Sequence, residues 1–62
     1  MEKLSKVDFL KIHAQEIEDL VEYTIMYRAD GYNRLRIWKE FRENGTAGDL
    51  ILEAFRRVGL VI

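Results

Sequence analysis

Hydrophobic residues in the first half of the chain spread over more of a helix than one face. Their spacing between residues 5 and 28 is helical, at about 100° per residue, and the chain contains no proline. One broad side would carry Phe9, Leu10, Ala14, Ile17, Leu20, Val21, Ile25 and Tyr27, and a second side Ile12, Tyr23 and Met26. A helix that is apolar over so much of its circumference is buried on two sides or completed by a partner. In a chain of 62 residues, a partner is the simpler explanation.

Polar residues and a glycine mark both ends of this helix. Ser5 fits an N-cap, and Asp8 stands three residues on in a near capping box. Asp30 and Gly31 form the break, since glycine readily takes the left-handed conformation that follows many helices. The sequence therefore predicts one long helix from residue 5 to about residue 28 or 29.

A second, shorter helix is predicted from about residue 32 or 33 to residue 43. Asn33 can cap its start, and Asn44 and Gly45 end it, because both residue types tolerate positive φ. Its apolar positions recur mainly at a spacing of three, at Leu35, Trp38 and Phe41, with Ile37 beside them. These side chains form the predicted apolar face of the helix.

The third helix is predicted to begin at Thr46, whose pairing with Asp49 repeats the near capping box, and to end at Gly59. Its apolar face would hold Leu50, Ile51, Ala54, Phe55 and Val58, and its polar face Asp49, Glu53, Arg56 and Arg57. Glu53 and Arg57 are spaced for an ion pair worth about 0.2–0.5 kcal/mol. No internal repeat is evident, and residues 1–62 are interpreted as a single helical domain.

The pattern as a whole predicts an all-α fold, a three-helix unit in which a long first helix precedes a compact helix–turn–helix. A single core of this size supplies only about 3–5 kcal/mol of net stability unless something reinforces it. Cysteine is absent, which excludes disulfides and a cysteine-based zinc site. We therefore expect reinforcement by assembly into a homodimer or higher oligomer, with the first helices packed antiparallel.

Some apolar residues fall outside the faces assigned to the core, and they are the candidate contacts with a partner. They are Ile12, Tyr23, Met26, Leu52 and the C-terminal Leu60, Val61 and Ile62. These residues predict a small non-catalytic module for protein–protein interaction or assembly. Such an adaptor or regulator would bind itself or another protein through apolar helix faces.

Side chains that carry chemistry are sparse. His13 is the only histidine, and without a second histidine or a cysteine it lacks the converging ligands of a metal site. It is interpreted as packed or interfacial, and in an interface it would make assembly pH-dependent. The acidic cluster Glu16, Glu18, Asp19 and Glu22 is interpreted as a solvated face, because so small a unit has little room for a catalytic cleft. We expect no enzyme activity, no cofactor and no metal.

Hydropathy argues against a membrane protein. No stretch approaches the roughly 20 apolar residues of a membrane span, and the first residues lead into no apolar run of signal-peptide length. We expect a cytoplasmic protein without membrane contact.

Charge is distributed unevenly although the net charge is only −1. Residues 1–30 carry four Lys or Arg against seven Asp or Glu, and residues 31–62 carry six against four. We expect the two halves to neutralise each other within the fold or across a dimer. The alternative is a phosphate-binding surface, since arginine favours planar, bidentate partners.

A stretch near the C-terminus supports that alternative. Residues 52–61, Leu-Glu-Ala-Phe-Arg-Arg-Val-Gly-Leu-Val, resemble the end of the recognition helix in winged-helix DNA-binding domains, where Gly-Leu-Val leads into a wing hairpin. The resemblance implies a small helix–turn–helix transcriptional regulator with the first helix as its dimerisation arm. Its candidate contacts to phosphates or bases are Arg34, Arg36, Lys39, Arg42, Arg56 and Arg57.

The sequence departs from this family in three ways. Asp49 and Glu53 would oppose phosphates on the same face as the arginines, and Phe41 stands where the helix–turn–helix pattern favours a small residue. The isoelectric point of about 5.7 is also not that of a domain with a basic stripe.

A second local similarity concerns assembly rather than DNA. Trp38, residues 44–50 and residues 52–60 are similar to the last helices of death domains, which are six-helix modules of homotypic protein contact. The similarity covers about a third of the chain, and the remainder is too short for the other helices of that family. A designed or engineered helical bundle without function is a third hypothesis.

Overall fold

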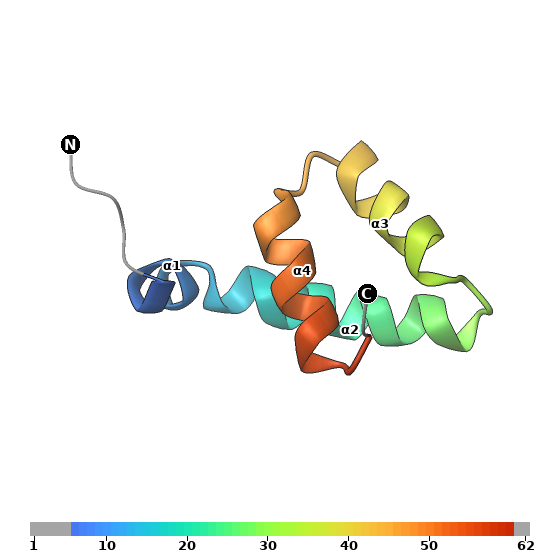
Figure 1. Cartoon of the computed structure of the whole chain (residues 1–62), viewed down its shortest axis with the longest axis horizontal. Helices are drawn as coiled ribbons and strands as arrows, with labels where there is room; N and C mark the ends of the chain where they lie inside the picture. Colours follow the sequence, from blue (N-terminus) through green and yellow to red (C-terminus); the bar gives the residue numbers. More distant parts are fainter. Residues whose placement is uncertain (1–5, 61–62) are drawn as a thin grey trace.

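The computed structural model describes residues 6–60, and this part of the chain contains four helices and no strand (Figure 1). Helix α1 spans Lys6–Ile12, α2 spans Ala14–Ala29, α3 spans Arg34–Glu43 and α4 spans Gly48–Arg57. The predicted all-α class is confirmed, and α3 and α4 are the predicted second and third helices. Ser5, the predicted first cap, and the tail residues Val61 and Ile62 lie outside the described residues.

The predicted single long helix is wrong, because His13 divides it into α1 and α2. The backbone of His13 has φ −102° and ψ 16°, far from the ψ of about −42° in an α-helix. Its ring centroid lies 4.7 Å from that of Phe9, and its Nδ1 lies 3.2 Å from Oε1 of Glu16. The bend turns α1 away from the axis of α2 (Figure 1), and Phe9 and Leu10 pack against the core.

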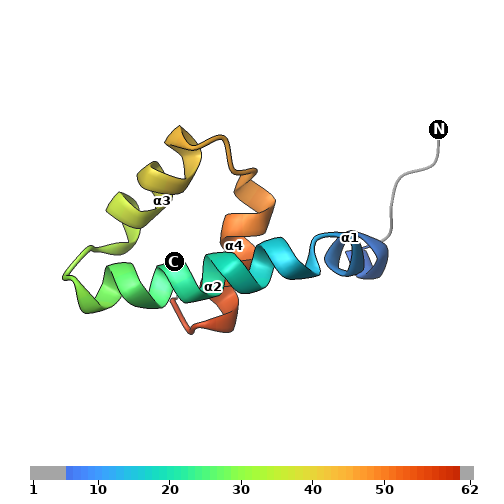
Figure 2. The same ribbon diagram turned by 180° about the vertical axis from the view of Figure 1, so that it is seen from behind.

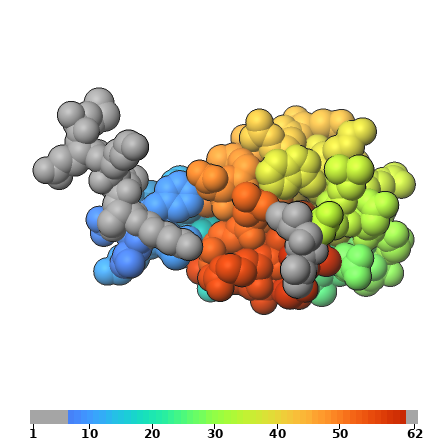
Figure 3. All heavy atoms as spheres, viewed as in Figure 1, coloured from blue at the N-terminus to red at the C-terminus, as the bar shows by residue number. Residues whose placement is uncertain are grey.

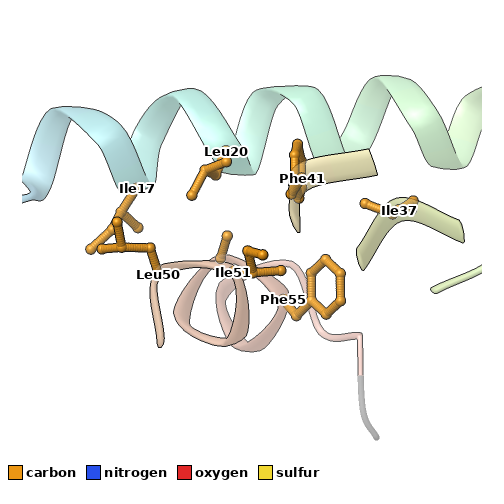
Figure 4. Packing of buried hydrophobic residues seen from close by; sticks show 8 residues of the cluster. Ile17, Leu20, Ile37, Phe41, Leu50, Ile51 and Phe55 are labelled. Atoms are coloured by element: carbon orange, nitrogen blue, oxygen red, sulfur yellow. The ribbon is translucent and has the colours of Figure 1, made fainter. Parts of the chain in front are cut away.

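The core lies where α4 crosses α2, and α3 closes one side of it (Figure 2). Figure 4 shows Ile17 and Leu20 of α2 directed toward Leu50 and Ile51 of α4. The buried apolar residues of the cluster are Ile17, Leu20, Ile37, Phe41, Leu50, Ile51, Ala54 and Phe55. The apolar face predicted for the third helix is therefore the one that α4 buries.

Helices α2, α3 and α4 end in the same hydrogen-bonded turn. After α2, the N–H of Gly31 donates to the carbonyl of Arg28 at 3.0 Å, and the N–H of Tyr32 donates to that of Tyr27 at 2.9 Å. This pair of hydrogen bonds is a Schellman motif, and the same pair closes α3 and α4. The glycines of the three turns are Gly31 (φ 90°), Gly45 (φ 86°) and Gly59 (φ 78°).

These turns arise from a sequence repeat, so the expectation of no internal repeat is wrong. An aromatic residue, an arginine, two further residues and a glycine recur every 14 residues, at 27–31, 41–45 and 55–59. The aromatic residue packs in or against the core two positions before the last residue of the helix, and the glycine after the helix takes the left-handed conformation. The repeat sets the points at which α2, α3 and α4 end.

The helix starts were predicted with mixed success. Asn33 caps α3 as predicted, since its Oδ1 accepts a hydrogen bond from the backbone N–H of Arg36 at 2.9 Å. The predicted cap of the last helix is wrong, because Ala47 and not Thr46 occupies the N-cap and makes no side-chain hydrogen bond there. Thr46 instead belongs to the turn that closes α3, where its N–H donates to the carbonyl of Phe41.

Candidate interaction surface between α3 and α4

Large apolar side chains remain exposed on several sides of the described chain. They are Val7, Ile12, Tyr23, Ile25, Met26, Leu35 and Leu52. Single exposed apolar residues are normal on a protein surface, whereas neighbouring ones mark a contact site. Those on α3 and α4 gather around a hollow, and on α2 Ile25 and Met26 are neighbours.

A shallow groove of about 230 Å³ lies between α3 and α4. Its lining consists of Arg34, Leu35, Trp38, Leu52 and Phe55, and we call it the α3–α4 groove. Leu35 is 66% exposed and Leu52 is 40% exposed, whereas Phe55 is buried at the base. Figure 3 shows the two helices, in yellow and in orange to red, meeting on the near face of the molecule. Four of the five lining side chains are apolar or aromatic, so the groove suits apolar side chains from another polypeptide.

Trp38 is positioned by the start of α4. A Cβ atom on Gly48 would lie 3.1 Å from Cη2 of the indole, closer than ordinary van der Waals contact. Glycine at this position lets the indole lie directly against the first turn of α4. The half-buried ring thereby joins the two walls of the groove.

Basic side chains of α3 lie beside the groove. A second hollow of about 330 Å³ shares Leu35 with it and is lined mainly by polar residues, the basic Arg36 and Lys39 and the acidic Glu40 and Glu43. The guanidinium carbon of Arg36 lies 4.3 Å from the ring centroid of Tyr32, a cation–π contact that holds it at the start of α3. With Arg34 in the groove itself, the α3 side of the apolar lining is bordered by three basic residues and by Glu40 and Glu43.

Two of the predicted basic contacts on α4 are bound to a carboxylate of the same helix. Oε2 of Glu53 lies 2.6 Å from Nη2 of Arg56 and 2.9 Å from Nε of Arg57. The predicted Glu53–Arg57 pair is confirmed, but Glu53 was expected on an exposed face and is only 7% exposed. Both arginines lie over the Glu53 carboxylate. A rule for the spacing of one ion pair at a time does not predict that arrangement.

These hydrogen bonds hold the pKa of Glu53 well below its usual range, at about 2 instead of 4.5. Because the carboxylate is favoured in the folded state, its stabilising contribution is full above about pH 4.5 and is lost as the pH falls toward 2. The arginines are exposed to solvent, so we expect a loss of only about 1 kcal/mol in the free energy of unfolding. Urea unfolding at about pH 5.5 and about pH 2.5 measures it.

Glu53→Gln is the control for this pH dependence. The variant lacks the titrating group, so the free energy of unfolding should fall less between the two pH values than in the unaltered chain. Equal losses in both proteins would assign the acid sensitivity to other carboxylates.

Among the described residues, no group of three or more His, Cys, Asp and Glu side chains converges as metal ligands would. In the described part of the chain, His13 contacts the carboxylate of Glu16. The acidic residues on α2, Glu16, Glu18, Asp19 and Glu22, are exposed. Within residues 6–60, no buried side-chain nitrogen or oxygen lacks a hydrogen-bond partner.

The predicted partner contacts fall into three groups. Ile12, Tyr23, Met26 and Leu52 are all at least 40% exposed. Leu60 is half-buried and packs against the core, because the turn after α4 returns the chain to Phe55. Val61 and Ile62 lie outside the described residues.

The sequence analysis missed Leu35 as a candidate contact. Spacing placed it on the apolar face of the second helix, but the face that α3 buries carries Ile37 and Phe41. A signal was available, since Leu35 stands between Arg34 and Arg36, whereas Ile37 begins an i,i+4 pair with Phe41. Arg34, Arg36, Lys39 and Arg42, the predicted nucleic-acid contacts on α3, are all exposed.

Comparison with protein-family models, with curated proteins and with solved structures gives no match for this chain. The winged-helix and death-domain resemblances therefore rest on the local residues alone. Among the described helices, none has the length and apolarity needed to cross a membrane.

Proposed function

We propose that the chain is a small non-catalytic interaction module that binds apolar side chains of another polypeptide in the α3–α4 groove. One observation carries the proposal: Leu35, 66% exposed, stands beside Trp38 and Leu52 in a lining that is apolar except for Arg34. Exposing a leucine beside an aromatic ring is unfavourable in water, and burial of such a group on binding is typical of helix-in-groove recognition. Trp38 and Arg34 belong to the residue types that dominate binding energy at interfaces.

DNA binding is less well supported by the geometry. The exposed residues of α4 are Asp49, Leu52, Arg56 and Arg57, and both arginines already contact Glu53. A recognition helix with an acidic residue, a leucine and two arginines held by a carboxylate has little net attraction for phosphates. The exposed basic residues of α3 serve better as the border of a protein-binding groove.

The test is selection from a displayed library of amphipathic helical peptides against the immobilised chain. Leu35→Asp, which places a charge in the groove at an exposed position, is the loss-of-function variant. Ile12→Asp is the matched control, since Ile12 is 63% exposed but lies on α1. We expect selected peptides to lose at least about tenfold in affinity for Leu35→Asp and to bind Ile12→Asp unchanged.

Peptides that bind Leu35→Asp as tightly as the unaltered chain would place recognition elsewhere on the surface. A selection that returns no binder would contradict the proposal outright. Circular dichroism of both variants establishes that neither substitution has unfolded the helices.

A further inference from the structure

Helix α2 carries a strip of exposed side chains on the side away from the core. The buried residues of α2 are Ile17, Leu20 and Thr24. Glu18, Glu22 and Met26 recur every four residues along the opposite side of the helix, with Ile25 at its edge. All four are exposed, Ile25 by 55% and Met26 by 58%. We call these four residues the α2 ridge.

The α2 ridge and the α3–α4 groove are complementary in both charge and polarity. The ridge presents two carboxylates followed by two apolar side chains within its last turns. The groove presents Leu35 and Leu52 with Arg34 in its lining. The adjoining hollow carries Arg36 and Lys39 together with Glu40 and Glu43, so basic side chains outnumber acidic ones by three to two in the two linings. Opposite charges beside matched apolar surfaces favour a specific and correctly oriented contact.

We infer that the occupant of the groove is the α2 ridge of a second copy of this chain. Ile25 and Met26 of one copy would cover Leu35 and Leu52 of the next, and the carboxylates of Glu18 and Glu22 would approach the basic residues of α3. The inference rests on the proposed function and deepens it by naming the partner. It also accounts for two exposed apolar surfaces on so small a chain, because each covers the other.

A contact between two copies of the ridge is less favourable. In an antiparallel arrangement, Glu18 and Glu22 of one copy would lie either against the same carboxylates of the other or against Ile25 and Met26. The first arrangement juxtaposes like charges and the second places charges on apolar side chains. The antiparallel pairing of first helices that the sequence predicted is therefore less favourable than contact of the α2 ridge with the α3–α4 groove.

The two surfaces face away from each other. Helix α4 passes in front of α2 in Figure 1 and behind it in Figure 2, and α3 lies above α2 in both views. Because Ile17 and Leu20 of α2 point toward α4 (Figure 4), the ridge on the opposite side of α2 lies away from α4, so one copy offers its ridge to one neighbour and its groove to another. Such a contact is heterologous, and it builds a series or ring of copies rather than a two-fold dimer.

Sedimentation velocity over rising concentrations tests the inference, with variants that disable one surface each. Leu35→Asp places an anion opposite the acidic ridge, and Met26→Lys places a cation opposite the basic border. Each variant alone should remain monomeric up to about 1 mM, whereas the unaltered chain should associate with a Kd on the order of 10–100 μM. Ile12→Asp, the control, should assemble like the unaltered chain.

An equimolar mixture of the two variants is the decisive sample. Met26→Lys retains a groove and Leu35→Asp retains a ridge, so the mixture should form a 1:1 heterodimer that grows no further. Fluorescence of Trp38, the one tryptophan of the chain, should change on mixing because it lines the groove. Failure of the mixture to dimerise while the unaltered chain associates would overturn ridge-in-groove assembly.

A monomeric unaltered chain would also overturn the inference. The peptide selection then separates the two proposals. If the unaltered chain is monomeric but the selection yields peptides whose binding depends on the groove, the proposed function stands with another polypeptide as partner. If there is neither peptide binding nor self-association, both proposals are wrong.

Discussion

Phe41→Ala should leave the chain largely unfolded at 25 °C. Phe41 is 4% exposed, and its ring meets that of Tyr27 edge-on at 5.8 Å between centroids, so it joins α3 to α2. Truncating a buried phenylalanine costs about 3–5 kcal/mol, which is as large as the whole net stability of about 3–5 kcal/mol expected for a core of this size. Circular dichroism should show a reduced helical signal and no cooperative thermal transition.

Leu35→Ala is the matched control for this prediction. Both residues are apolar positions of α3 and both stand on the spacing of three that the sequence displays, but Leu35 is 66% exposed. Its truncation should change the free energy of unfolding by no more than about 0.5 kcal/mol. Equal effects at the two positions would mean that the buried face of α3 has been assigned wrongly.

Ala54→Leu should destabilise the fold although it adds apolar surface. Ala54 is fully buried in the face of α4 that packs on α2. Alanine and leucine have nearly equal helix propensity, so the substitution tests packing rather than helix formation. Extra methylene groups in a filled core cost about 1–3 kcal/mol, and urea denaturation at neutral pH measures the loss.

Ala29→Leu controls for a general effect of leucine. Ala29 is exposed at the end of α2, where the larger side chain finds room, and the free energy of unfolding should stay within about 0.5 kcal/mol of that of the unaltered chain. Unchanged or increased stability in Ala54→Leu would show that a void of that size exists between α2 and α4.

Helix ends that depend on local chemistry could be predicted from the sequence. Gly31, Gly45 and Gly59 were each expected to end a helix, and each does so with positive φ. Glycine marks such positions because other residues adopt this conformation at a cost. The cap at Asn33 follows from the same kind of short-range hydrogen bonding.

Features that depend on how helices cross could not be predicted in this way. No glycine or proline in the sequence marks the break at His13. The break occurs where Phe9 and Leu10 pack on the core. Spacing of three and spacing of four are both compatible with one helix face, so spacing alone did not separate Ile37 from Leu35, although the arginines on both sides of Leu35 favoured its exposure.

Only part of the candidate surface could be predicted from the sequence, because the rest depends on how the helices cross. Leu52 and Met26 stood out because they fall off the main apolar faces. The groove itself requires residues of α3 and α4 that are 17 positions apart, such as Leu35 and Leu52, to lie side by side. The burial of Glu53 likewise needs both arginines at once.

The recurring aromatic-Arg-x-x-Gly turn has a consequence for the order of folding. Its hydrogen bonds span only six residues, so the ends of α2, α3 and α4 are encoded locally and can form before the helices meet. What remains is the mutual placement of three helices whose C-terminal ends are already fixed, and agreement between local and global preferences favours rapid folding. The bend at His13 and the start of α4 at Ala47 have no side-chain cap, so we expect these boundaries to form only with the core.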